Sequence, residues 1–343
     1  MLDEEPAGGR TQVTVELIED AAERLHGLAV RTPLLESTQL NEALGMRILF
    51  KPECLQRTGS FKFRGAYTKL SRLPMERRHA GVVAYSSGNH AQGVAAAAGL
   101  LGIPATILMP SDAPTIKIEN TRDYGAEVVF FERNKDDRQA LAERMASERG
   151  ASIVAPFDDV DVISGQGTVG LEITRQADYM NISVDDILCP VGGGGLLSGL
   201  STAVKAHMPL TRIWCAEPEG YDDVIQSLAA DQLVSVTVGA PTICDAIVTP
   251  QPGWITFDII KRFVSGGFSV SDREVMDAMA VLFDRMKLVA EPGGCAALAA
   301  LLQQRRQFAG RTVVVVVSGG NVDRADFSRI LSEASALENV LRA

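Results

Sequence analysis

The hydrophobic positions of the chain alternate between short runs rich in Val, Ile and Leu and longer stretches with helical spacing. Several short runs are continuous, which is typical of strands buried on both faces. Strands are predicted at 47–51, 81–85, 105–109, 127–131, 152–155, 187–191, 212–216 and 312–317. Helices are predicted at 91–101, 136–147, 165–177, 196–207 and 272–287, the last with a capping box from Ser271 and Glu274. The alternation indicates an α/β protein with mainly parallel sheets.

Length, charge and cysteine usage limit the classes of protein that the chain can represent. Its 343 residues suffice for about two domains. The chain has 43 acidic and 33 basic residues and no basic cluster, so nucleic acid is not expected as a partner. Five cysteines without a CxxC pair are typical of reduced thiols in a cytoplasmic protein.

No targeting or membrane segment is evident in the sequence. The first ten residues are acidic and polar, so no signal peptide is expected and the cytoplasm is the predicted location. A long uncharged run at 81–111 contains several polar side chains and Pro104, which would leave polar groups unsatisfied in a bilayer. We therefore expect no membrane partner.

The 31 glycines are the unusual feature of the composition. Four glycine-containing turns each follow a predicted strand or precede a predicted helix, at 58–64, 86–90, 191–196 and 318–321. In parallel α/β sheets, ligands bind beyond the carboxyl ends of the strands. Glycine at these ends allows the backbone to approach a ligand closely, so the four turns are candidates for one binding site.

Four consecutive glycines lie between the predicted strand 187–191 and the predicted helix 196–207. They are Gly192, Gly193, Gly194 and Gly195. Such a loop at a helix N-terminus can hold a phosphate with its backbone N–H groups. Glu217, about 20 residues further on, would suit a dinucleotide fold, but no G-x-G-x-x-G register fits. A single phosphate is the favoured ligand and a dinucleotide is the alternative.

Lys62 lies between two aromatic residues, Phe61 and Phe63. Apolar surroundings lower the pKa of a lysine, and the neutral amine is a nucleophile that can form a Schiff base with a carbonyl. A reactive lysine together with a phosphate loop predicts a cofactor that carries both an aldehyde and a phosphate. That cofactor is pyridoxal 5′-phosphate (PLP).

These motifs together resemble the serine/threonine dehydratase family of fold type II PLP enzymes, which includes threonine ammonia-lyases and serine racemases. The resemblance runs from 35 to 323 and rests on KPECLQRTGSFKFRGA at 51–66, SSGNHAQG at 86–93, GGGG at 192–195 and SGGNVD at 318–323. It implies a tryptophan synthase β-like fold of two open, twisted, mainly parallel α/β domains. The large PLP-binding domain would comprise 1–74 and 159–343, and the small domain 75–158. A homodimer or homotetramer is also implied.

The resemblance further implies how the cofactor is held. Lys62 would carry PLP through a Schiff base and then remove the substrate Cα proton, while residues 192–195 would bind the phosphate. Asn89 would hydrogen-bond the 3′-oxygen, and Ser318 would face the pyridine nitrogen. Because a neutral hydroxyl leaves the ring a weaker electron sink, loss of a β-leaving group is favoured over transamination. The further cofactor-binding residues are Phe61 and Glu291.

In the family, the turn at 86–90 takes the substrate carboxylate at the start of a helix. Its residues here are Ser86, Ser87, Gly88, Asn89 and His90. Ser87 matches the serine that acts on the opposite face of the cofactor in racemases. Two roles are therefore open for it, a second acid–base group or carboxylate binding alone. His90 is expected to order the loop rather than to act as a base.

A divalent-cation site is a further expectation. Glu217, the main-chain carbonyl of Tyr221 and Asp223 match the cation site of serine racemase-like members. Two carboxylates and a carbonyl, completed by water, suit Mg²⁺ or Ca²⁺. The alternative is a helix-capping cluster without a metal, since acidic residues favour a helix N-terminus.

The resemblance predicts a PLP-dependent ammonia-lyase that converts L-threonine, L-serine or both to a 2-oxo acid and ammonia by β-elimination. The alternatives are a serine racemase, or a dehydratase of another β-hydroxy amino acid such as 3-hydroxyaspartate or a hydroxyectoine-derived compound. A β-replacement enzyme is less favoured, because that motif usually reads Lys-Asp-Arg where this chain has Lys-Phe-Arg at 62–64.

Two departures from the family pattern leave the size of the pocket open. Ala246 stands where many relatives have glycine, and Gly293 stands where serine or threonine is commoner. About 20 residues follow Asp323, too few for the C-terminal regulatory domain of biosynthetic threonine dehydratases. Feedback inhibition by isoleucine is therefore not expected.

Overall fold

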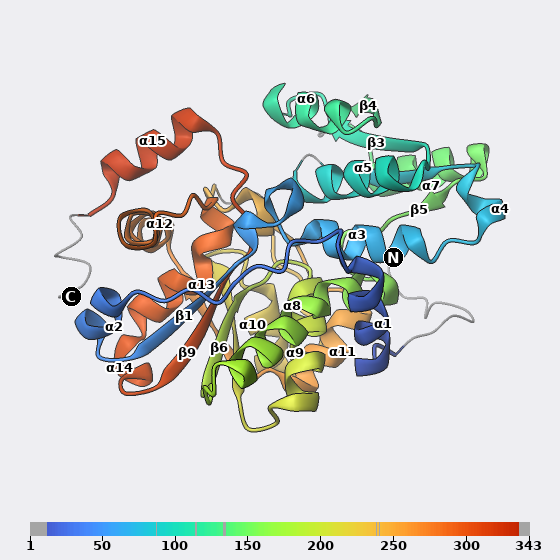
Figure 1. The fold of residues 1–343 in the computed structure, drawn as a ribbon. Helices are drawn as coiled ribbons and strands as arrows, with labels where there is room; N and C mark the ends of the chain where they lie inside the picture. Colours follow the sequence, from blue (N-terminus) through green and yellow to red (C-terminus); the bar gives the residue numbers. More distant parts are fainter. Residues whose placement is uncertain are drawn as a thin grey trace.

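The computed structural model describes residues 12–86, 88–113, 115–132, 135–237, 239 and 241–335. Within these residues the chain forms two parallel sheets, one of five strands and one of four. Figure 1 shows the five-stranded sheet in the lower left half of the molecule and the four-stranded sheet at the upper right. The expectation of two mainly parallel α/β domains is confirmed.

The five-stranded sheet is buried between two layers of helices. Its strands in spatial order are β1 (Arg47–Pro52), β9 (Thr312–Val317), β6 (Asp186–Pro190), β7 (Arg212–Pro218) and β8 (Gly266–Val270). Alternate residues of β9 join different cores, because successive side chains of a strand point to opposite faces. Val313 and Val315 pack with α12 (Asp272–Met286) and α13 (Pro292–Gln303). Val314 packs with α8 (Val160–Tyr179) and α9 (Gly195–His207) on the other face.

The four-stranded sheet is covered in the same way. Its strands in spatial order are β4 (Glu127–Phe131), β3 (Ala105–Pro110), β2 (Val82–Tyr85) and β5 (Ser152–Ile153), all paired in parallel. Helix α5 (Asn89–Leu101) packs on one face and α7 (Arg138–Arg149) on the other. All four strands lie inside the predicted small domain, whose boundaries at 75 and 158 stay a prediction.

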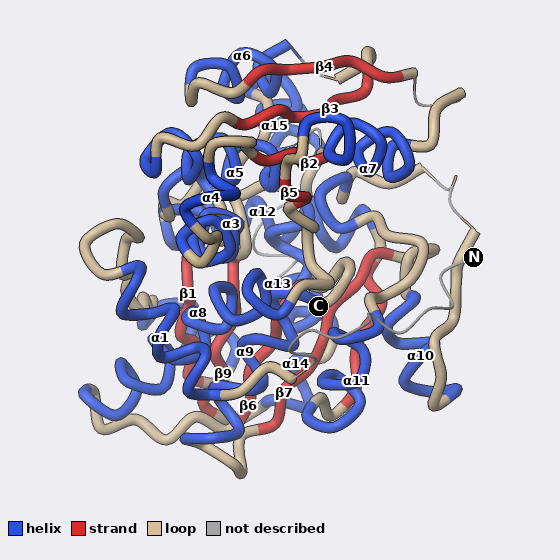
Figure 2. Tube along the Cα trace, turned by 90° about the vertical axis from the view of Figure 1, so that its right-hand side faces the viewer, coloured by secondary structure: helices blue, strands red, loops and turns tan. Residues whose placement is uncertain are grey.

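Helix α3 (Lys62–Ser71) connects the two sheets. It packs against α5 of the smaller sheet and α8 of the larger one, and it lies between those helices in Figures 1 and 2. The approach to α5 is close, because a Cβ at Gly93 would lie 3.0 Å from the carbonyl carbon of Lys62. The first residue of α3 is thus held where the two domains meet.

The remaining elements complete the two cores. The helices are α1 (Val15–Leu25), α2 (Thr38–Leu44), α4 (Met75–Arg78), α6 (Thr115–Asp123), α10 (Asp223–Ala230), α11 (Trp254–Phe263), α14 (Arg305–Phe308) and α15 (Arg324–Glu333), and the 3₁₀ turns are Glu53–Leu55, Arg57–Gly59 and Asp245–Ile247. Every predicted strand and helix is present, as is the capping box at Ser271. Strand β8 was not predicted, and α8 begins at Val160 rather than at 165. None of the described helices is long and apolar enough to cross a bilayer.

Candidate active site

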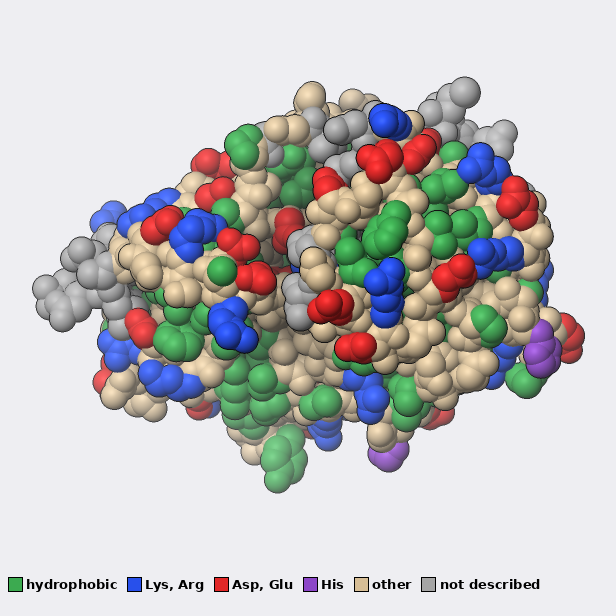
Figure 3. Space-filling model, turned by 90° about the horizontal axis from the view of Figure 1, so that it is seen from above, with side chains coloured by type: hydrophobic (Ala, Val, Ile, Leu, Met, Phe, Trp, Pro, Cys, Tyr) green, Lys and Arg blue, Asp and Glu red, His purple; other side chains and the backbone are tan. Residues whose placement is uncertain are grey.

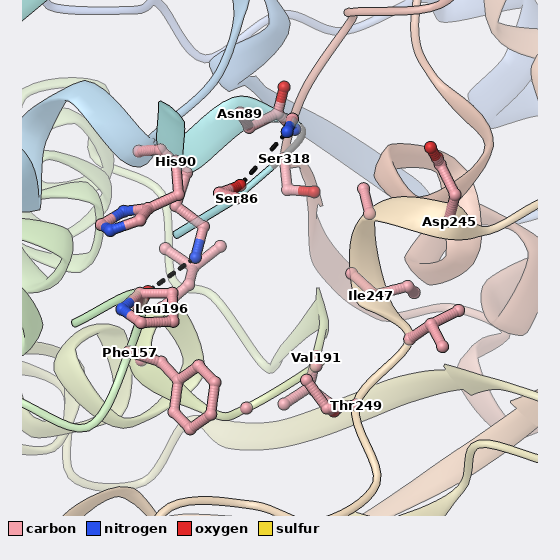
Figure 4. A pocket seen from close by; sticks show the side chains of 18 of the residues that line it. Ser86, Asn89, His90, Phe157, Val191, Leu196, Asp245, Ile247, Thr249 and Ser318 are labelled. Atoms are coloured by element: carbon pink, nitrogen blue, oxygen red, sulfur yellow. Dashed lines mark hydrogen bonds between the residues drawn. The ribbon is translucent and has the colours of Figure 1, made fainter. Parts of the chain in front are cut away.

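A cavity of about 580 Å³ lies where the carboxyl ends of strands from both sheets meet. Figure 4 shows side chains from several segments turned toward it, with Asn89 and Ser318 near one end and Phe157 and Val191 near the other. The predicted site residues that line it are Phe61, Lys62, Ser86, Gly88, Asn89, His90, Gly192, Gly193, Gly194, Gly195, Glu291 and Ser318. Ser87 lies outside the described residues. Residues of all four glycine-containing turns therefore line one cavity.

Lys62 presents its amine to this cavity from the first residue of α3. Nζ donates a hydrogen bond to the carbonyl oxygen of Pro156 at 2.7 Å and lies 5.2 Å from the centre of the Phe61 ring. Burial disfavours the charged ammonium and lowers the pKa of Lys62 to about 8, although the nearby Glu291 carboxylate acts in the opposite direction. At neutral pH a minor fraction of the amine is therefore uncharged and nucleophilic.

The tetraglycine loop forms another part of the cavity wall, immediately before α9. The first backbone hydrogen bond of this helix runs from the N–H of Ser198 to the carbonyl of Gly194, so the preceding N–H groups have no partner within the helix. Gly194 has a φ of +95°, which only glycine adopts easily. A Cβ at Gly193 would lie 2.3 Å from the Phe157 ring. The loop is thus a backbone cradle for an anion.

A second helix N-terminus faces the cavity from the smaller sheet. Helix α5 begins at Asn89, after Gly88, whose N–H donates to Ser86 Oγ at 3.2 Å. Asn89 Nδ2 donates to Glu291 Oε1 at 2.6 Å, and Asn321 Nδ2 donates to Asn89 Oδ1 at 2.7 Å. The two bonds fix which way the Asn89 amide faces. The N–H groups of the first turn of α5, before the bond from Gln92 to Gly88, have no partner within the helix, so this turn could hold an anion separately from the tetraglycine loop.

Two buried titratable groups of the site have shifted pKa values. Burial raises the pKa of Glu291 to about 7, although the hydrogen bond from Asn89 acts in the opposite direction. Burial lowers the pKa of His90 to about 3, and the charge of Lys62 lowers it further. His90 Nε2–H donates to the carbonyl of Val154 at 2.8 Å. The imidazole is therefore neutral at physiological pH and tied to the backbone, which agrees with an ordering role.

Comparison with known proteins identifies the family. The sequence profile described as "Pyridoxal-phosphate dependent enzyme" matches residues 26–319, most of the chain. The chain belongs to this family. It is 44% identical to the L-threo-3-hydroxyaspartate ammonia-lyase of Pseudomonas sp over 91% of this chain and 96% of that protein. It is 38% identical to the serine racemase of Schizosaccharomyces pombe over 93% of this chain and 98% of that protein. The crystal structure of a threonine deaminase from T.th. superposes with a TM-score of 0.85 at 43% identity. The match covers 90% of this chain and 99% of that chain.

The chain is therefore a PLP-dependent enzyme of fold type II in the serine/threonine dehydratase family. It is a lyase of the threonine/serine dehydratase type. The cavity of this enzyme fits PLP. The tetraglycine loop, where neighbouring residues leave little room for any Cβ, suits the phosphate, and the partly neutral amine of Lys62 suits the aldehyde. The dinucleotide alternative is not favoured, because the Glu217 carboxylate accepts hydrogen bonds from the N–H groups of Val224 and Ile225 instead.

The two departures from the family pattern lie side by side in this enzyme. A Cβ at Gly293 would come within 3.5 Å of the Ala246 methyl group and 3.2 Å of the Ile247 side chain. Ala246 lines the cavity. The two positions are therefore neighbours at the edge of the cavity, and a side chain at 293 would contact the methyl group at 246.

The predicted cation residues lie between the end of β7 and the start of α10, away from the lining of the cavity. Glu217 is fully buried, and burial followed by the charge of Asp223 raises its pKa well above the ordinary value. Asp223 is also buried, with both carboxylate oxygens lacking a hydrogen-bond partner, and burial raises its pKa to about 7. The described residues contain no group of three or more His, Cys, Asp or Glu side chains placed for a metal. Two buried carboxylates nevertheless suit a cation completed by carbonyls and water.

Sequence reasoning missed several residues of the site. Pro156 and Phe157, which contact Lys62 and Gly193, follow β5, so the rule that ligands bind at the carboxyl ends of strands could have indicated them. Lys117 of α6 forms an ion pair with Asp245 at 2.8 Å across the cavity. Arg138 of α7 also lines the cavity. Nothing in the local sequence marks these charged residues as part of the site.

Proposed function

We propose that this enzyme converts L-threonine, L-serine or both to the corresponding 2-oxo acid and ammonia by β-elimination. The observation that carries the proposal is the convergence of one partly neutral lysine and two separate helix N-termini on a single cavity. One N-terminus suits the cofactor phosphate and the other the substrate carboxylate. Bound PLP supplies the electron sink for loss of the substrate Cα proton.

The other steps of the reaction are assigned to residues of the chain. Lys62 would hold the cofactor covalently and then remove the Cα proton with the same amine. The turn before α5 would bind the substrate carboxylate, with His90 holding the turn against Val154. Phe61 would lie against the cofactor, and Asn89, held by Glu291, would orient its 3′-oxygen.

Ser318 would face the pyridine nitrogen with a neutral hydroxyl. It lines the cavity and is almost fully buried. A hydroxyl cannot keep the ring nitrogen protonated as a carboxylate would, which favours prompt loss of the β-hydroxyl group over transamination. Ser87 remains the candidate for a second acid–base group or for carboxylate binding alone.

The second candidate function is the dehydration of L-threo-3-hydroxyaspartate. This substrate has a side-chain carboxylate, which needs a cationic side chain in the cavity. Lys117 and Arg138 line the cavity, but so do Asp136, Asp137 and Asp245. Lys117 is already paired with Asp245, which leaves the Arg138 guanidinium, 5.8 Å from the Tyr85 ring centre, as the candidate partner. The acidic surroundings favour substrates with a single carboxylate.

A substrate panel tests the proposal. Wild-type enzyme with PLP is expected to release 2-oxobutanoate from L-threonine or pyruvate from L-serine, with ammonia in equal amount.

An Arg138→Ala variant should leave those rates within about twofold, because a monocarboxylate makes no ion pair there. A loss of about tenfold confined to 3-hydroxyaspartate would support the second candidate. Chiral analysis of the residual serine measures racemisation. If neither threonine nor serine yields an oxo acid, the proposed substrate is wrong.

We also propose that Mg²⁺ or Ca²⁺ binds between Glu217 and Asp223, with the carbonyl of Tyr221 as a further ligand. What supports it is the pair of buried carboxylates, of which Asp223 has no hydrogen-bond partner. Millimolar Ca²⁺ or Mg²⁺ is expected to raise the melting temperature of chelator-treated enzyme by several degrees, through binding to the folded state only. Asp223→Asn should abolish the shift. Asp222→Asn, which removes a neighbouring carboxylate bonded to Gln226, should retain it. Equal melting temperatures with and without cation in wild type would contradict the site.

We further infer a cytoplasmic homodimer or homotetramer. All five cysteines are free, as expected for thiols kept reduced. Acidic and basic side chains are interspersed over the face shown in Figure 3, which presents no continuous basic field for nucleic acid. Apolar side chains such as Leu55, Phe283 and Val289 are exposed and available for association between subunits.

A further inference from the structure

The segment 156–158 connects the reactive lysine, the tetraglycine loop and helix α11. The carbonyl of Pro156 accepts the hydrogen bond from Lys62 Nζ. The ring of Phe157 covers Gly193, and Asp158 reaches the N-terminus of α11. Three consecutive residues thus contact three separate parts of the molecule. Asp158 is the member that has no contact with the cavity of its own.

The Asp158 carboxylate caps α11 from a distant part of the chain. Oδ2 accepts from the N–H of Trp254 at 3.1 Å, and Oδ1 accepts from the N–H groups of Ile255 at 2.9 Å and Thr256 at 3.2 Å. These are three of the N–H groups that a helix cannot satisfy by itself. The residue just before α11 is Gly253, which has no capping side chain, so Asp158 supplies the cap. The start of α11 is therefore held in place by Asp158.

Thr256, in this first turn, holds the tetraglycine loop from behind. It is fully buried and does not line the cavity. Its hydroxyl donates to the carbonyl oxygen of Gly193 at 2.7 Å. Because the C=O and N–H of a trans peptide point in opposite directions, holding the Gly193 carbonyl away from the cavity turns the N–H of Gly194 toward it. A Cβ at Gly194 would lie only 2.8 Å from the Thr256 side chain, so the contact is tight.

We propose that Thr256 and Asp158 are positioning residues that preset the backbone of the phosphate cradle before the cofactor arrives. Asp158 fixes the first turn of α11, and the Thr256 hydroxyl in that turn, together with the N–H of Gly253 at 3.3 Å, fixes the carbonyl of the peptide between Gly193 and Gly194. The cradle then needs no reorganisation when it binds the phosphate, which strengthens binding because ordering costs are met in advance. The inference rests on the proposed use of PLP, and it concerns the phosphate end of the cofactor alone.

The test compares two probes on apoenzyme, PLP and pyridoxal, which lacks the phosphate. Thr256→Val keeps the shape of the side chain and removes the hydroxyl. It is expected to raise the Kd for PLP about tenfold, the value of one hydrogen bond to a preset group, and to leave the Kd for pyridoxal within about twofold. Thr256→Ser should restore PLP binding, because it keeps the hydroxyl. Asp158→Ala should act in the same direction as Thr256→Val. Binding is followed by cofactor absorbance, and circular dichroism shows that each variant is folded.

Matched controls separate positioning from general destabilisation. Thr202→Val removes a buried hydroxyl that donates to the Ser198 carbonyl in the adjacent α9, and Asp159→Ala removes an equivalent carboxylate cap from α8. Both should lower the melting temperature and leave the ratio of the two Kd values unchanged. If Thr256→Val and Asp158→Ala weaken PLP and pyridoxal equally, or weaken neither, the inference is overturned. Wild-type apoenzyme that binds neither probe would instead overturn the proposed function.

Discussion

Replacing Lys62 by alanine is expected to lower the rate of 2-oxo acid release by about 10⁴-fold, because one amine is proposed both to hold the cofactor and to move the Cα proton. The position of Lys62 supports both roles, holding the cofactor and moving the proton. It lies in the cavity shared by the tetraglycine loop and the start of α5, and among the described residues its hydrogen-bond partner is a backbone carbonyl. Single-turnover assays of oxo acid formation measure the loss.

The covalent part of this prediction has its own measurement. Borohydride treatment of wild-type enzyme with PLP should add the reduced cofactor to the peptide that contains Lys62, as read by mass spectrometry. Lys69→Ala is the matched control, since Lys69 lies on the same helix and its amine forms an ion pair with Asp159 at 2.6 Å. It should lower stability without affecting cofactor fixation. Attachment at another lysine in wild type would contradict the assignment.

The same amine sets the pH dependence of cofactor capture. Only the neutral amine attacks an aldehyde, and burial lowers the pKa of Lys62 to about 8 from its ordinary value of 10.5. The rate at which apoenzyme takes up PLP should therefore rise with pH to a plateau, half-maximal near pH 8. Glu291→Gln removes a charge that raises this pKa, so its profile should move to lower pH. A wild-type midpoint near 10 would show that the amine is solvated.

A helix or strand was predictable where its burial produces a recognisable pattern of apolar and polar residues in the sequence. Strand β9 is buried on both faces and therefore appears as an uninterrupted apolar run. Strand β8 lies at the edge of the sheet and is mostly half-buried, and its sequence Gly-Gly-Phe-Ser-Val carries no comparable run. Helix α13 is buried on nearly all sides, so it lacks the polar face that marks a helix in sequence.

The chemistry of the site was predictable where it depends on consecutive residues, such as the tetraglycine loop and the residues around Lys62. Contacts between residues far apart in the sequence produce no recognisable local motif. The Asn89 amide meets Glu291 across 202 positions, and the Thr256 hydroxyl meets the Gly193 carbonyl across 63. These partners are ordinary polar residues in their own segments. Only the fold shows that they orient the groups facing the cavity.

The glycine excess has a second cause that the turns did not indicate. Helices α8 and α9 also use glycine where their backbones meet, since a Cβ at Gly199 would lie 2.3 Å from the carbonyl oxygen of Ile163. These glycines bring α9, which begins at the phosphate loop, close against α8, which begins beside Asp158. Close helix packing and close approach to a ligand therefore both contribute to the composition, and both bear on the cofactor site.

Gly193→Ala is expected to raise the Kd for PLP by about 100-fold, which corresponds to about 2.7 kcal/mol. The added methyl group would lie 2.3 Å from the Phe157 ring, so either the ring or the loop must move. The ring is packed against the loop, and a displaced loop turns its N–H groups away from the phosphate. Overpacking of this kind typically costs about 1–3 kcal/mol, which is sufficient for the expected effect. Titration of apoenzyme with PLP measures the change.

Two further variants decide whether Phe157 is the cause. Gly192→Ala alters the same loop, but its methyl group would lie 3.2 Å from the Ile247 backbone, so a much smaller loss is expected. Phe157→Ala combined with Gly193→Ala removes the ring that the methyl group meets and should recover most of the affinity, a non-additive result that identifies contact between the two positions. Equal losses at 192 and 193, or no recovery in the double variant, would show that the loop tolerates side chains and that its shape is held by some contact other than the Phe157 ring.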